Sequence, residues 1–169
     1  MIFQNLQRRS FVYLFPAILT IPLLGSVGSA QSQVVSPFAN LEGRWTGEGR
    51  LGVKDNPPEN VKCRATYLQG ANADELKQTI RCATAGGAIE VISTVQHSAG
   101  ALKGHWQETM HNIEGDLEGQ VTPKGFRIQV KGSELAANMD IIAKDDSQIV
   151  EIQFFNSALI GLTLLLKKG

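Results

Sequence analysis

From residue 41 almost to its end, the chain alternates apolar and polar positions. In 41–53, Trp45, Leu51 and Val53 share one face with glycines, while Arg44 and Glu48 lie on the other. A period of two is typical of a strand with one buried face. The same alternation recurs between turn signals, and the predicted strands are 41–53, 61–69, 76–84, 88–96, 101–108, 113–121, 126–131, 135–143, 148–156 and 158–167.

Three consecutive segments fit one another in a single register. Pairing 101–108 with 113–121 sets Trp106 against Gly115 and His105 against Asp116. Large side chains then oppose glycines, which allows packing over a closely approached backbone. The following Thr-Pro-Lys-Gly at 122–125 is a type I turn pattern and pairs Val121 with Phe126.

The only two cysteines predict a second register. Folding 61–69 onto 76–84 through the loop 70–75 sets Cys63 against Cys82 and Tyr67 against Gln78. Residues directly opposed on antiparallel strands are close enough for a disulfide. A disulfide in turn indicates an oxidising compartment.

Two stretches also carry helical signals. Asn72 and Glu75 resemble a capping box ahead of a helix over 72–85, and 133–144 has Leu135, Met139 and Ile142 at helical spacing. The strand interpretation is preferred for both. About ten consecutive strands joined by hairpins favour an all-β, single-domain, antiparallel up-and-down barrel, because closure removes exposed edges.

The N-terminal part has the pattern of an export signal. Arg8 and Arg9 precede an apolar stretch that ends in small residues, so cleavage is expected after Ala30. The chain then divides into a signal peptide (1–30), a flexible leader (31–40) and a barrel domain (41–169), placed in the periplasm or secreted. The arginine pair also resembles a twin-arginine signal, and the general or twin-arginine route stays open.

Composition adds little. The full chain has 16 basic and 16 acidic residues, so removal of Arg8 and Arg9 leaves it slightly acidic. This balance gives no global signature of nucleic-acid or membrane-surface binding. The apolar stretch is shorter than a membrane-spanning helix requires, and no transmembrane segment is expected after signal removal.

The run Gly43-Arg44-Trp45 resembles the Gly-x-Trp start of calycin-type barrels, the lipocalins and their relatives. In lipocalins an arginine late in the chain packs on this tryptophan, whereas Lys167 and Lys168 are the basic residues near this chain's end. The segments 45–49, 61–67, 76–83 and 104–109 together resemble a family of small exported bacterial proteins of unassigned function. This resemblance implies a shared calycin-like fold and export, and it brings no activity.

The expected inward face suggests a ligand site. It carries Trp45, Tyr67, Gln78, Trp106 and Glu108 among aliphatic residues and glycines. Inward glycines leave space for a small apolar or amphipathic ligand, with the polar groups as handles. The alternative is a filled barrel, with Glu108 near its rim.

A second candidate lies on the outer face. Pairing Val53 with Val61 would align Arg50, Arg64 and Arg81 in one row. Like charges directly opposed in a sheet are destabilising, so the row predicts an anionic envelope component or an acidic protein as partner. The alternative is a register shift that dissolves the row. The last strand is apolar on both faces and predicts a further contact patch.

Catalysis and metal binding have little support. His105, Glu108 and His111 are metal-ligand types, but His105 and Glu108 point to opposite faces of a strand. No nucleophile elbow or phosphate-binding loop is present. We therefore expect no enzyme, metal or cofactor, but an exported binding module of the cell envelope. The alternative is a protein- or polyanion-contact module such as an inhibitor or structural factor. The oligomeric state is left open.

Overall fold

The computed structural model describes residues 35–169, and the predicted signal sequence lies outside these residues. The described part is all strand and turn. Its ten strands are β1 (Gly43–Val53), β2 (Glu59–Gln69), β3 (Glu75–Thr84), β4 (Gly87–Ser98), β5 (Ala101–Glu108), β6 (Ile113–Thr122), β7 (Gly125–Gly132), β8 (Ala136–Lys144), β9 (Ser147–Phe155) and β10 (Leu159–Lys168).

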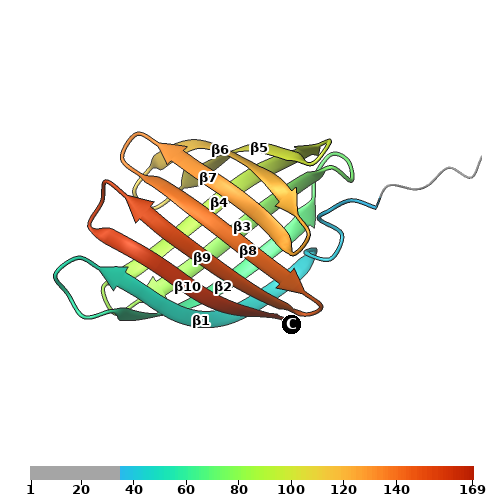
Figure 1. Cartoon of the computed structure of the whole chain (residues 1–169). Helices are drawn as coiled ribbons and strands as arrows, with labels where there is room; N and C mark the ends of the chain where they lie inside the picture. The colour runs from blue at the N-terminus through green and yellow to red at the C-terminus, as the bar shows by residue number, and fades with distance from the viewer. Residues whose placement is uncertain (1–34) are drawn as a thin grey trace, which may run out of the picture. The chain divides into compact units, whose positions relative to one another are not determined.

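The strands form one closed antiparallel barrel in which each pairs with its neighbours in sequence and β10 pairs with β1 (Figure 1). This confirms the predicted fold class. The two ambiguous stretches, 72–85 and 133–144, contain β3 and β8. Tertiary pairing decides these cases, because each strand satisfies its backbone groups through two neighbours.

The register predicted for β5, β6 and β7 is confirmed. Trp106 lies opposite Gly115, His105 opposite Asp116, and Val121 opposite Phe126. A Cβ at position 115 would lie 1.9 Å from the Lys131 carbonyl oxygen. The backbone of β7 therefore comes too close to β6 for any side chain at this position.

The cysteine register is confirmed as well. Cys63 and Cys82 are directly opposed, their Cα atoms are 4.1 Å apart, and they form a disulfide. Both side chains face the barrel interior and are buried. The bridge joins β2 to β3, so it fixes the register of these two neighbouring strands.

The first hairpin has a shifted register, which was the alternative to the pairing that aligns the arginines. Leu51 lies opposite Glu59, not Cys63, and Arg50 lies opposite Asn60 rather than Arg64. The turn after Val53 is tight, since the Asn56 N–H donates to the Val53 carbonyl, and β2 begins directly after the two prolines. The shift moves each pairing by an even number of residues, so the inward and outward faces stay as predicted.

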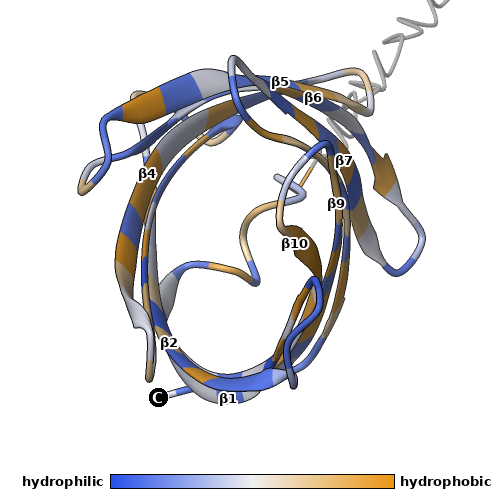
Figure 2. Ribbon diagram, turned by 90° about the vertical axis from the view of Figure 1, so that its left-hand side faces the viewer, coloured by the Kyte–Doolittle hydropathy of each residue, from blue (hydrophilic) through white to orange (hydrophobic). Residues whose placement is uncertain are grey.

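The chain before β1 enters one end of the barrel, which we call the leader end (Figure 2). Phe38 and Leu41 are each 3% exposed, and Phe38 stacks on Phe126 at 5.8 Å between ring centres. The described part of the predicted leader therefore packs into the barrel core. Residues 35–169 contain no helix with the length and apolar character needed to cross a membrane.

Candidate functional site

Trp45 anchors the packed interior at the leader end. Its indole N–H donates to the Leu41 carbonyl at 2.7 Å, and its ring meets Tyr67 edge to face at 6.4 Å. Lys168, opposite Trp45 on β10, places its ammonium 5.5 Å from the ring centre. The basic residue that packs on Trp45 is therefore Lys168, next to the end of the chain. Trp45 is buried, and its contact with Lys168 links β1 to β10, the first and last strands of the closed sheet.

Tyr67 meets Gln148 inside the barrel. Its hydroxyl donates to Gln148 Oε1 at 3.1 Å, and both side chains are buried. Burial raises the pKa of Tyr67 far above its usual value, and the hydrogen bond from its hydroxyl to Gln148 opposes this only in part. The two side chains form a polar contact within the apolar core, and the amide nitrogen of Gln148 has no hydrogen-bond partner among residues 35–169.

Three of the five predicted interior residues lie in one cross-strand row. Tyr67 pairs with Gln78, Gln78 with Ser93, and Ser93 with Trp106, on β2 to β5. Gln78 and Ser93 are partly exposed although they face inward. The structure gives their side chains no hydrogen-bond partner among residues 35–169. They are therefore the polar groups of the wall that are free to meet a ligand.

Trp106 closes the far side of this row. A Cβ at Gly132 would lie 2.8 Å from the Trp106 ring, and the indole N–H donates to the Lys131 carbonyl at 3.3 Å. The ring therefore lies across the glycine backbone of β6 and β7. It forms part of the wall and is 6% exposed.

The interior is unevenly packed along the barrel. Toward the leader end most of the large inward side chains are buried, among them Trp45, Tyr67 and Leu166. Toward the opposite end, which we call the far end, many inward apolar side chains keep exposed surface, although they face the centre of the barrel. These are Leu51, Ile80, Ile89, Val91, Ile113, Val130, Met139, Ile152, Phe154 and Leu162. Ile89 is 40% exposed. A barrel filled by its own side chains would bury them.

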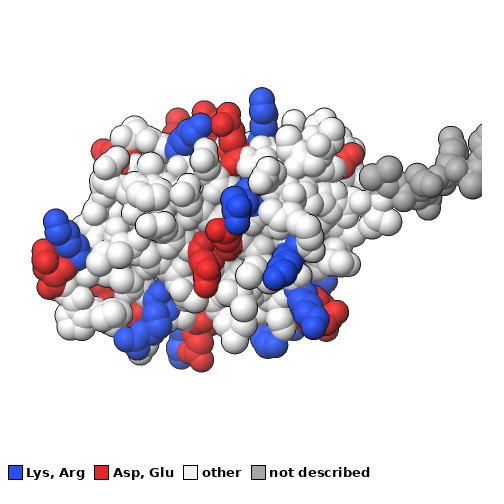
Figure 3. All heavy atoms as spheres, in the orientation of Figure 1, with Lys and Arg blue, Asp and Glu red and all other residues white. Residues whose placement is uncertain are grey.

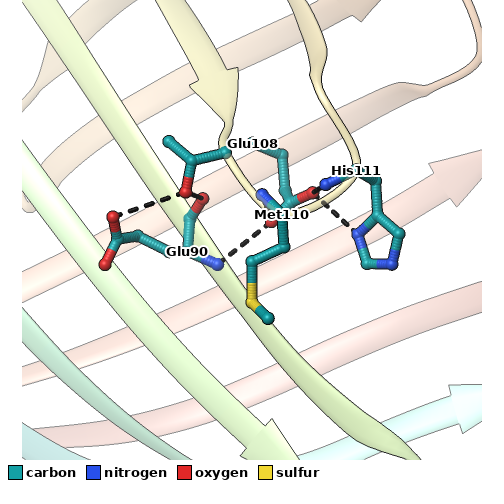
Figure 4. A network of polar contacts seen from close by, with 5 residues as sticks. Glu90, Glu108, Met110 and His111 are labelled. Carbon is teal, nitrogen blue, oxygen red and sulfur yellow. Dashed lines mark hydrogen bonds and ion pairs between the residues drawn. The ribbon is translucent and has the colours of Figure 1, made fainter.

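Glu108 has a local structural role (Figure 4). Its carboxylate accepts hydrogen bonds from the backbone N–H groups of Glu90, Met110 and His111, and it contacts the His111 ring at 2.8 Å. Burial raises its pKa, but the hydrogen bonds outweigh burial, and the pKa of Glu108 is lowered. The carboxylate holds the β5–β6 turn against β4 rather than facing the lumen as a free handle.

The predicted arginine row is only partly formed. Arg64 does lie opposite Arg81, but Arg50 donates to Asn60 at 2.9 Å instead of joining them. Arg81 pairs with Glu90, whereas Arg64 has no ion-pair partner among residues 35–169. The two arginines line a groove of about 640 Å³ on the outer face of β1–β4. Its other lining residues are the outward Thr46, Lys62, Ala83, Ala88 and Glu90, the inward Gly47, Cys63, Cys82 and Ile89, and Met110 of the β5–β6 turn.

The histidines do not converge. His105 contacts Asp116 across the outer face at 3.3 Å, as its predicted pairing requires, while His111 binds Glu108. Within residues 35–169 no three metal-ligating side chains of the His, Cys, Asp and Glu types gather.

Known structures resemble the barrel. Rv2717c from M. tuberculosis matches it with a TM-score of 0.64 and 16% identity, over 78% of this chain and 94% of that protein. The S-type phycobiliprotein lyase CPES from Guillardia theta matches with a TM-score of 0.56 and 12% identity, over 78% and 90%. At these identities the likeness concerns the fold alone. No protein-family model and no curated protein sequence matches the chain.

Sequence reasoning missed Ser93 and Gln148. Ser93 was detectable, because it lies at an inward position of the predicted strand 88–96. Gln148 begins a strand beside a turn, where a polar residue is ordinary. Its contact with Tyr67 joins residues 81 positions apart in the sequence, so no local pattern reveals it.

Proposed function

We propose that this protein is an exported, non-catalytic binding module that holds a small apolar or amphipathic ligand in the far half of its barrel. The observation that carries the proposal is the set of inward apolar side chains with exposed surface in that half. Apolar surface of this kind gains about 25 cal/mol per Å² when a ligand covers it. Gln78 and Ser93 would bind the ligand's polar group from the wall.

The chemistry of the wall supports binding over catalysis. Exposed inward surface in the far half is mostly aliphatic, and the carboxylate of Glu108 is held by four hydrogen-bond contacts. The neighbour from Guillardia theta is named a lyase, and no activity is carried over from it. Export is proposed from the sequence pattern of 1–30 together with the disulfide, which an oxidising compartment favours.

The test compares binding of a fluorescent apolar probe by the parent protein and by variants in which a larger inward side chain narrows the lumen. Anilinonaphthalene sulfonate is titrated against the protein and against Val91→Phe, whose new ring points inward from β4. The matched control is Ile92→Phe, since Ile92 is the next residue and is 39% exposed on the outer face. We expect Val91→Phe to weaken binding at least about tenfold and Ile92→Phe to leave it unchanged.

A melting curve shows whether Val91→Phe is folded. Ile152→Phe narrows the lumen from β9 on another part of the wall, so it repeats the test at an independent position. If the folded variants bind the probe as the parent does, the lumen is not the site. Native mass spectrometry of protein purified from the envelope then identifies the natural ligand by its mass.

A second candidate function is anion binding in the outer groove. Within residues 35–169, Arg64 forms no ion pair there beside Arg81, and the groove is of ligand size. We expect salt-sensitive retention on immobilised heparin that Arg64→Glu abolishes. Lys77→Glu is the control, because it makes the same charge change on the outer face of β3 away from the groove. Equal retention of both variants would refute this function.

A further inference from the structure

Three exposed aliphatic side chains form a row across the outer face of the last three strands. Ile142 of β8 lies opposite Ile149 of β9, and Ile149 lies opposite Leu165 of β10. They are 41%, 39% and 51% exposed. Exposed apolar side chains that lie next to one another in this way are typical of a contact site.

Charged side chains of opposite sign flank this apolar row. Two positions along each strand toward the leader end stand Lys144 and Lys167, on either side of Ser147. Two positions toward the far end, Asp140 lies directly opposite Glu151. Figure 3 shows this face, with carboxylates near its middle, basic groups nearer the leader end and uncharged surface between them.

The flanking charges are incompletely matched within the chain. Asp140 pairs with Arg127 at 2.8 Å, but among residues 35–169 the side chains of Lys144, Lys167 and Glu151 form no ion pair. Two carboxylates directly opposed on neighbouring strands repel each other. The arrangement therefore favours a basic group supplied from outside the barrel at Glu151.

We propose that the chain forms a two-fold symmetric dimer through this row. A two-fold axis running along the row, between two facing copies, brings each aliphatic side chain onto its own equivalent. The same rotation reverses the strand direction, so the basic side of one copy covers the acidic side of the other. Lys144 and Lys167 of each copy then flank Glu151 of its partner, and one surface serves both copies.

The surface is small, and its size sets the kind of dimer. Three aliphatic side chains and their charged flanks make an interface at the low end of specific association. The dimer is therefore concentration-dependent, and salt weakens it because the charges at its rim are exposed. A second copy of this chain is sufficient as the partner, because each copy carries both the basic side chains and the acidic side chains that face each other in the dimer.

Sedimentation velocity of the full chain as purified, from about 1 µM to about 500 µM, tests the proposal. We expect a reversible monomer–dimer equilibrium that Ile149→Lys weakens at least about tenfold. Ile92→Lys is the matched control, since Ile92 has the same 39% exposure on β4. A chain that stays monomeric, or a dimer that survives Ile149→Lys, overturns the proposal.

Charge reversal tests the two-fold arrangement itself. Glu151→Lys alone places a lysine beside Lys144 and Lys167 of the partner and weakens the dimer. Adding Lys167→Glu to the same chain restores a Lys–Glu contact across the axis, while Lys144 keeps its place opposite Asp140 of the partner, and we expect dimerisation to recover in part. If the double variant is no more dimeric than Glu151→Lys while its melting curve is that of the parent, the two copies do not meet in this way. Binding of the monomer to anionic lipid vesicles through the same row would also refute self-association.

Discussion

Lys168 lies directly across from Trp45, with its ammonium 5.5 Å from the centre of the indole ring. The two residues belong to the last and first strands, and the same ammonium donates to the Asn40 carbonyl at 3.2 Å. One side chain thus ties together the closing seam of the barrel, the buried tryptophan and the segment that enters the leader end.

This contact predicts a measurable loss of stability when the charge is removed. Lys168→Gln should lower the free energy of unfolding by about 1–2 kcal/mol, through loss of the cation–π contact and the hydrogen bond to Asn40. Lys168→Arg should keep most of it. Lys167→Gln, on the outer face, should change stability by less than about 0.5 kcal/mol. Urea unfolding at low protein concentration measures all three, and equal effects at positions 167 and 168 would contradict the assignment.

The Tyr67–Gln148 pair predicts a non-additive response. Tyr67→Phe removes the hydroxyl and leaves the whole buried amide of Gln148 unpaired, which should cost about 1–3 kcal/mol. Adding Gln148→Leu removes the unpaired amide as well, and we expect the double variant to regain much of this loss. A double-mutant cycle by chemical unfolding gives the coupling. Independent, additive effects would mean that the pair does not interact.

Glu108 predicts an acid-dependent stability. Its folded-state pKa lies below the ordinary value of 4.5, so its contribution is complete above that value. The contribution is lost as pH falls through the lowered folded pKa, because the protonated group no longer accepts the turn's N–H groups as well. We expect Glu108→Gln to be less stable than the parent near neutrality, with the difference disappearing under acid. Thermal melts across this pH range test it, and a difference that persists under acid would exclude the charged interaction.

The disulfide predicts a stabilisation of ordinary size for its loop. Cys63 and Cys82 are separated by 19 residues, and opening a loop of this length should cost about 3 kcal/mol. The Cys63→Ala/Cys82→Ala variant should therefore unfold at lower urea concentration than the oxidised parent. The urea midpoint of the parent under reducing conditions should approach that of the variant. If the oxidised parent and the variant unfold at the same urea concentration, the disulfide does not stabilise the fold.

The registers that the sequence predicts correctly share a local cause. β5, β6 and β7 are joined by short turns, and glycines opposite large residues such as Trp106 leave one pairing that fits. The two cysteines constrain β2 and β3 in the same way. The first hairpin has no such constraint, so the sequence left open whether its strands pair in the register of the arginine row or in a shifted one, and the shifted register with Arg50 opposite Asn60 is observed.

The candidate site was predictable only in part. Tyr67, Gln78 and Trp106 do lie in one interior row, and Trp45 is on the same face. Their roles differ because Trp45 and Tyr67 lie in the packed half. Which half is packed depends on Phe38 and Leu41 entering one end; Phe38 lies before the alternating pattern, and the pattern does not show that Leu41 turns into the core.

The sequence by itself determines the strand order and the face on which each side chain lies, because the period of two is local and an even register shift preserves it. Only the tertiary structure decides the pairing of β1 with β2, the contact of Tyr67 with Gln148 and the exposure of the far half of the lumen. These depend on barrel closure, which brings together residues far apart in the chain, and on how much of the enclosed volume the side chains fill.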